Sequence, residues 1–207
     1  VHFKNGMQNH RAVMALSAIT GSYDRPGGMV PTYLTYAHSI GGFETLEPEF
    51  SVEKYPKDAP MPIGCDRFPL WHSLIGEMQA CDLPRAILTG KPYPLRMLYA
   101  HGMNFRMFPG AAEMEKALEQ LEFFVDVDPF LTDSAKYADI VLPACTSYER
   151  GEFKVFGGGF AQYTQPVIAP LYQARRDDEI ILELARRLDV DDELLKSDRD
   201  TCIRHMI

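Results

Sequence analysis

The amino-acid sequence predicts an α/β fold, a Rossmann-like three-layer domain with a mainly parallel sheet flanked by helices. Apolar runs typical of buried strands occur at residues 95–100, 123–127 and 140–142. An amphipathic helical pattern separates the first two runs, and a short polar segment separates the last two. Strands that alternate with helical segments along a chain usually form a parallel sheet built from βαβ units.

Four helices are predicted from apolar residues that recur at helical spacing, and they span residues 9–19, 68–81, 111–122 and 173–188. The third pattern is the clearest, because Met114, Leu118 and Leu121 share one face while glutamate and lysine residues point outward. Asp82-Leu83-Pro84 is expected to end the second helix. Asp133-Ser134 is expected to start a short helical turn.

We predict a single domain over residues 1–207. Two segments lie outside the pattern of strands and helices. A long loop spans residues 27–66, where an alternating stretch at residues 33–36 favours a short strand. A charged, helical tail spans residues 189–207. Loops of this length are usually functional or cover a neighbouring part of the protein.

Composition narrows the class of protein. The chain has 207 residues, of which 46% are hydrophobic, enough for one domain with a substantial core. Its net charge of −8 argues against a nucleic-acid partner. No run approaches the ~18 apolar residues of a membrane span, and no targeting signal follows Val1. Because an initiator methionine is also absent, we expect a piece of a longer protein, and we predict no compartment.

The cysteines do not predict a metal site within this chain. Cys65, Cys81, Cys145 and Cys202 are scattered and form no C-x-x-C pair, so we expect free thiols. The glycine-rich segment at residues 21–28 follows a helix and lacks the G-x-x-x-x-G-K-S/T spacing, so we interpret it as a turn rather than a phosphate-binding loop.

Polar residues follow the predicted strands at the ends where such sheets bind ligands. Gly102 and Asn104 come after the first strand, Asp128 ends the second, and Arg150 lies just past the third. Glycine lets a backbone approach a ligand closely, and the asparagine amide can both donate and accept hydrogen bonds. An asparagine here also suits an ordinary turn, and the same stretch also fits a plain strand–helix–strand core.

The segment from Asp128 to Pro143 closely resembles the signature D-x-F-x-T-x-S/T-A-x-x-A-D-I/V-V-L-P of the molybdopterin oxidoreductases, the dimethyl sulfoxide reductase superfamily. Two further segments, residues 15–28 and 173–188, resemble other stretches of the family. There are departures, because Ser22 stands where asparagine is usual and Phe105 replaces a proline. The resemblance covers residues 1 to about 188.

The resemblance implies a cofactor, a pair of molybdopterin guanine dinucleotides that chelate molybdenum or tungsten. Asp128 would accept the two N–H groups of a guanine edge, or contact ribose hydroxyls. Arg150 would pair with phosphate or pterin. Gly102 and Asn104 would contact the cofactor from the first turn, and Asp177 corresponds to a family carboxylate that reaches it, although Asp177 also suits a helix cap.

The family implies an oxidoreductase with two-electron chemistry in the full-length protein, as in anaerobic respiration. The metal's protein ligand and any iron–sulfur cluster lie upstream of the matched region, so this fragment should be inactive alone. Its expected partners are the rest of its own polypeptide and electron-transfer subunits. The alternative is a cofactor-free scaffold domain of the respiratory NADH dehydrogenase type, which the altered segment Phe156–Gly159 favours weakly. A generic nucleotide-binding domain is a third hypothesis.

Overall fold

The computed structural model describes residues 5–29, 59–75, 78–156 and 160–206. The chain divides into two compact units, Val1–Phe43 with Lys154–Gln162, and Glu44–Phe153 with Tyr163–Ile207. The single domain predicted over residues 1–207 stays a prediction. Most of the predicted long loop and the three glycines at 157–159 lie outside the described residues.

The first unit contains helix α1 (Gly6–Ile19) and most of a two-stranded sheet, β4 (Phe153–Phe156) and β5 (Phe160–Tyr163). The helix predicted over residues 9–19 is confirmed, but it begins three residues earlier, at Gly6.

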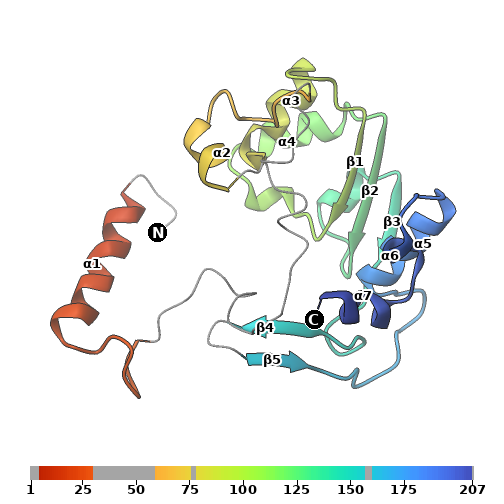
Figure 1. The fold of residues 1–207 in the computed structure, drawn as a ribbon. Coiled ribbons are helices and arrows are strands. Elements are labelled where there is room, and N and C mark those ends of the chain that lie inside the picture. Colours follow the sequence, from red (N-terminus) through yellow and green to blue (C-terminus); the bar gives the residue numbers. More distant parts are fainter. Residues whose placement is uncertain (1–4, 30–58, 76–77, 157–159, 207) are drawn as a thin grey trace. The chain divides into compact units, whose positions relative to one another are not determined.

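The second unit is built on a parallel sheet of three strands in the order β1-β2-β3 (Figure 1). These are β1 (Met97–His101), β2 (Phe123–Asp128) and β3 (Ile140–Pro143). In register, Val127 pairs with His101 on one side and Leu142 on the other. The predicted parallel sheet is therefore confirmed, and the carboxyl ends of its strands lie together at one edge.

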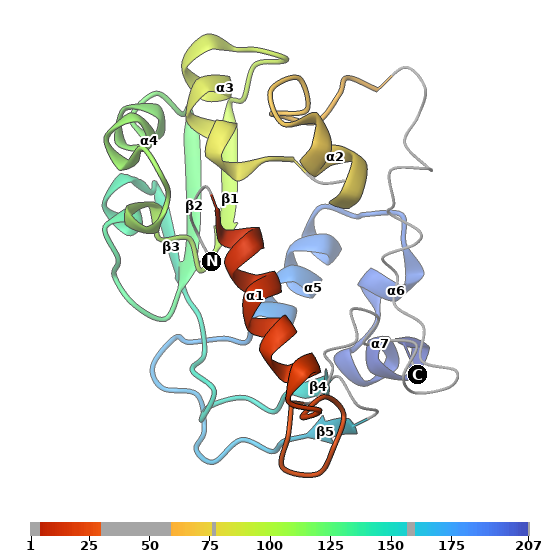
Figure 2. The ribbon, with the colours of Figure 1, turned by 90° about the vertical axis from the view of Figure 1, so that its left-hand side faces the viewer.

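Helices cover both faces of this sheet, since successive side chains of a strand point to opposite faces. On one face, Phe124 packs in a buried core with residues of α3 (Leu83–Thr89) and α4 (Ala111–Leu118). On the other, Val125 and Val127 pack against Ile180 of α5 (Asp177–Arg187). Figure 2 shows α4 and α5 on opposite sides of the sheet. The predicted flanking of the sheet by helices is confirmed.

The predicted second helix differs from the observed structure. Helix α2 (Pro69–Ile75) is followed by a short 3-10 turn, η4 (Ala80–Asp82), and then by α3. Asp82-Leu83-Pro84 therefore begins a helix instead of ending one. The physical reason is that proline is tolerated in a first helical turn, where its missing N–H group has no intrahelical partner.

Short helical turns follow the first two strands, and two short helices form the tail. The turns are η5 (Phe105–Met107) and η6 (Ser134–Tyr137), and η6 confirms the predicted turn. The tail contains α6 (Glu193–Lys196) and α7 (Arg199–Met206), as a helical tail predicts. No helix of the described segments is long and apolar enough to cross a membrane.

Candidate functional site

Asp128 is the last residue of β2 and is buried, with 8% of its surface exposed. Its Oδ1 atom accepts a hydrogen bond of 2.7 Å from the backbone N–H of Phe130, which forms a turn around Pro129. No hydrogen bond from the described residues reaches its Oδ2 atom. The carboxylate is therefore fixed in direction while one oxygen stays available to a ligand.

Gly102 and Asn104 form the turn that follows β1. Gly102 has a φ of +61°, in the left-handed region that favours glycine, and its N–H donates to the carbonyl of Val127 at 2.8 Å. A Cβ atom there would meet nothing within 4 Å, so the surrounding space is open. Asn104 Oδ1 accepts from the N–H of Arg106 at 3.2 Å. Asn104 thus caps η5 through its oxygen.

Arg150 and Asp177 bind each other. Arg150 Nη1 donates to Asp177 Oδ2, while Nε and Nη2 of Arg150 lie 2.9 and 2.7 Å from Glu152 Oε1. Asp177 Oδ1 lies 3.1 Å from His101 Nδ1. We call these four side chains, Glu152, Arg150, Asp177 and His101, the relay cluster. Each is partly buried, and they come from β1, from the first turn of α5 and from the segment after β3.

A buried carboxylate holds the segment that carries Arg150. Glu149 is 5% exposed and accepts hydrogen bonds from the hydroxyl and N–H of Thr146 and from the N–H of Leu171. These hydrogen bonds, the hydroxyl's foremost, hold the pKa of Glu149 below its usual range. Because Arg150 follows Glu149 directly, these hydrogen bonds also fix the backbone position of Arg150.

The segment before α5 runs parallel to the end of β3 and so delivers Asp177 to the sheet edge. Arg175 pairs with Ala144 as an isolated parallel bridge. The Arg175 carbonyl accepts from the N–H of Cys145 at 2.8 Å, and the Arg175 N–H donates to Pro143 at 3.0 Å. Asp177 is two residues further on, as the first residue of α5. Its carboxylate near a helix N-terminus is also favoured by the helix dipole.

The five predicted site residues all lie at the carboxyl edge of the sheet, but they form separate groups. Asp128 extends from the same strand face as Phe124, toward α4, because these positions alternate with Val125 and Val127. The relay cluster lies on the α5 side, where Tyr99 and His101 meet edge to face. Within the described residues, no hydrogen bond or ion pair joins Asp128 to the relay cluster.

Sequence reasoning missed His101, Glu152 and Asp126. Asp126 is fully buried in β2, and neither carboxylate oxygen has a hydrogen bond from the described residues. Burial, and secondarily the charge of Asp128, raise the pKa of Asp126 to about 6. The sequence could have indicated Asp126, because an aspartate inside an apolar strand is unusual. For His101, the sequence offers only its position directly before Gly102.

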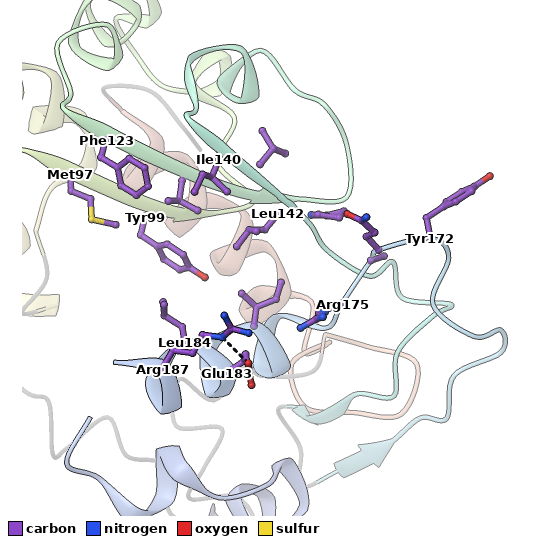
Figure 3. A pocket seen from close by; sticks show the side chains of 16 residues that line it. Met97, Tyr99, Phe123, Ile140, Leu142, Tyr172, Arg175, Glu183, Leu184 and Arg187 are labelled. Carbon is purple, nitrogen blue, oxygen red and sulfur yellow. Dashed lines mark hydrogen bonds and ion pairs between the residues drawn. The ribbon is translucent and has the colours of Figure 1, made fainter. Parts of the chain in front are cut away.

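A cleft of about 930 Å³ lies between the second sheet face and α5 (Figure 3). Its lining is mainly apolar, with Tyr99 and Leu142 extending from the sheet, and none of the predicted site residues lines it. Its charged residues include Arg187, which pairs with Glu183 at 2.8 Å. Because none of the predicted site residues lines this cleft, we place the candidate site at the strand ends instead.

In the described part of the chain, neither thiols nor carboxylates suggest a metal centre. Within the part of the chain that the structure describes, no group of three or more His, Cys, Asp or Glu side chains is arranged to hold a metal ion. The four cysteines are free. Burial, followed by the charge of Glu149, raises the pKa of Cys145, the cysteine nearest the site, so this thiol stays protonated at neutral pH.

Comparison with known proteins identifies the family. The family model of the molybdopterin oxidoreductases matches residues 1–187. The dopamine dehydroxylase of Eggerthella lenta is 34% identical over 194 residues, covering 90% of this chain and 19% of the relative. The dimethyl sulfoxide/trimethylamine N-oxide reductase of Cereibacter sphaeroides is 41% identical, covering 89% of this chain and 24% of the relative.

A solved structure agrees with the sequence relatives. The acetylene hydratase from Pelobacter acetylenicus superposes with a TM-score of 0.58 at 25% identity, covering 67% of this chain and 23% of that chain. The chain thus spans about a fifth to a quarter of the length of these relatives. Its matched segment and its parallel sheet lead to one conclusion: the chain belongs to the molybdopterin oxidoreductase family.

Proposed function

We propose that this chain binds the guanine dinucleotide form of the molybdopterin cofactor at the carboxyl edge of the sheet β1-β2-β3. The observation that carries the proposal is the hydrogen bonding of the Asp128 carboxylate. Its carboxylate is aligned by the N–H of Phe130, and Oδ2 has no hydrogen bond from the described residues. A guanine edge presents adjacent N–H donors, and a single carboxylate can accept both.

The remaining predicted residues fit a nucleotide bound at this edge. Gly102 leaves open space beside its backbone. The amide nitrogen of Asn104 has no hydrogen bond to the described residues, while its oxygen caps η5. Arg150 and Asp177 border the same edge as part of the relay cluster. Each hydrogen bond to a charged group contributes about 1.5–3 kcal/mol. So few contacts cannot hold two dinucleotides alone, and we assign the remaining contacts to other parts of a longer polypeptide.

We infer that the full-length protein is a molybdenum or tungsten oxidoreductase that carries out two-electron chemistry. The length of the relatives supports this, because the matched chain is only a fifth to a quarter of them. In this proposal the metal's protein ligand and any iron–sulfur cluster lie elsewhere in the polypeptide. The 207-residue chain is then inactive alone. Electron-transfer subunits and a role in anaerobic respiration are part of the same proposal.

Metal and nucleotide analysis of the protein at its natural length tests the function. We expect molybdenum or tungsten together with about two guanines per chain, as a bis-dinucleotide cofactor requires. Molybdenum or tungsten without guanine would refute the dinucleotide. Iron without molybdenum, tungsten or guanine would refute the enzyme and favour the cofactor-free scaffold of the NADH dehydrogenase type.

The substitution Asp128→Asn tests the proposed guanine contact. Asparagine can keep the turn with Phe130 through its oxygen, but it turns an amide donor toward guanine's own donors. Losing a charge-assisted contact of this kind lowers affinity about tenfold or more. We therefore expect a matching fall in bound guanine nucleotide. Asp191→Asn is the control, because it removes the same charge from an exposed residue.

A further inference from the structure

His101 is held in place by the protein but keeps one ring nitrogen for a ligand. It is the last residue of β1, and its Nδ1 lies 3.1 Å from Asp177 Oδ1. Its ring also meets Tyr99 edge to face, with centroids 5.1 Å apart. An imidazole that donates its Nδ1 proton to a carboxylate has its lone pair on Nε2. No hydrogen bond from the described residues reaches Nε2.

The relay cluster explains why His101, and not Asp177, faces the ligand. Both oxygens of Asp177 are taken, one by His101 and the other by Arg150. Arg150 in turn uses its remaining nitrogens on Glu152. Asp177 therefore positions the imidazole. The His101 side chain remains 29% exposed, so a ligand can reach it.

The contacts of the relay cluster favour a hydroxyl donor over a phosphate. Asp177 and Glu152 already accept hydrogen bonds from the guanidinium of Arg150, so this cation is engaged within the protein. An acceptor nitrogen at His101 Nε2 suits a hydroxyl group, which can donate a hydrogen bond.

The sheet register brings His101 within one nucleotide's reach of Asp128. His101 pairs with Val127, and Asp128 is the next residue of β2. Neighbouring strands lie about 4.8 Å apart. His101 shares the sheet face of its partner Val127, whereas Asp128 extends from the opposite face. The two side chains therefore lie on opposite sides of adjacent strand ends. Resting on the proposed function, we propose that His101 is a ribose-binding residue, whose Nε2 accepts a hydrogen bond from a ribose hydroxyl of the guanine nucleotide read by Asp128.

Calorimetric titration of the natural-length protein, purified free of cofactor, tests this residue. The probes are GDP, its 2′-deoxy and 3′-deoxy analogues, ADP and guanosine. We expect GDP to bind roughly three- to tenfold more tightly than one of the deoxy analogues, which is the effect of one neutral hydrogen bond. Equal binding of GDP and both deoxy analogues would overturn the role of His101. If guanine were still preferred over adenine, the proposed function would nevertheless stand.

Two substitutions separate ligand binding from a structural role. His101→Asn keeps a donor near the Nδ1 position for Asp177 but removes Nε2, so we expect it to abolish the ribose discrimination. His101→Gln replaces Nε2 with an amide group and should keep part of that discrimination. The opposite order would mean that His101 only supports Asp177. If His101→Asn instead lost the preference for GDP over guanosine, His101 would be a phosphate contact and not a ribose contact. His205→Asn, at an exposed position of α7, is the control.

Discussion

Replacing Asp126 by asparagine should remove a pH dependence from the stability of this protein. Asp126 is fully buried in β2, and its oxygens have no hydrogen bond from the described residues. A buried carboxyl without a partner favours its neutral form. The pKa of Asp126 is accordingly raised from 3.8 to about 6, first by burial and then by the charge of Asp128. Asparagine has a similar shape and does not ionise.

The sign and size follow from proton linkage. Between the unfolded and folded pKa values, the folded protein binds more protons than the unfolded chain, so the free energy of unfolding falls as pH rises. The difference in pKa, from 3.8 to about 6, corresponds to about 3 kcal/mol at 1.36 kcal/mol per pKa unit. This stability is present at about pH 4 and is lost by about pH 7. Asp126→Asn should lack this decline, although its unpaired amide also costs stability at every pH.

Urea unfolding followed by circular dichroism, repeated across this pH range, measures the effect. The informative quantity is the change in unfolding free energy with pH, because the cost of the buried amide cancels from it. Asp191→Asn serves as the control for losing one negative charge, since Asp191 is exposed. If wild type and Asp126→Asn had parallel pH curves, Asp126 would not be a buried acid with a raised pKa, and the packing assigned to β2 would be wrong.

Two further substitutions probe how the second unit is held together. Ser134 is fully buried, and its hydroxyl oxygen accepts from the N–H of Phe105 at 3.1 Å, so Ser134→Ala should lower the unfolding free energy by about 1–3 kcal/mol. An effect no larger than that of Ser147→Ala, at an exposed position, would contradict this. Asp82 is 1% exposed and binds Arg67 and Arg85, so Asp82→Ala should cost about 3–5 kcal/mol in urea unfolding. Arg67→Ala should cost far less, because 55% of that side chain is exposed, and equal costs would contradict the burial argument.

The sheet was predictable because its strands carry their signal locally. The runs at residues 123–127 and 140–142 are apolar and end at prolines, and both form strands close to those bounds. Helix α3 was not predictable in the same way, because Pro84 usually signals an end and here lies in a first turn. Asp82, at the start of this helix, also pairs with Arg67 from a segment before α2, a tertiary contact that no local pattern contains.

The candidate site was predictable as a set of positions but not as a set of contacts. Strand ends identify where Asp128 and Arg150 lie, whereas the face toward which each side chain points depends on register. Arg150 was expected to pair with phosphate or pterin, and in the structure it binds Asp177 and Glu152. A guanidinium already neutralised by two carboxylates attracts a phosphate weakly, because both partners would have to be displaced or screened. The arrangement therefore moves the expected ligand contact on this face from a charged pair to hydroxyl recognition, with His101 as the group that makes it.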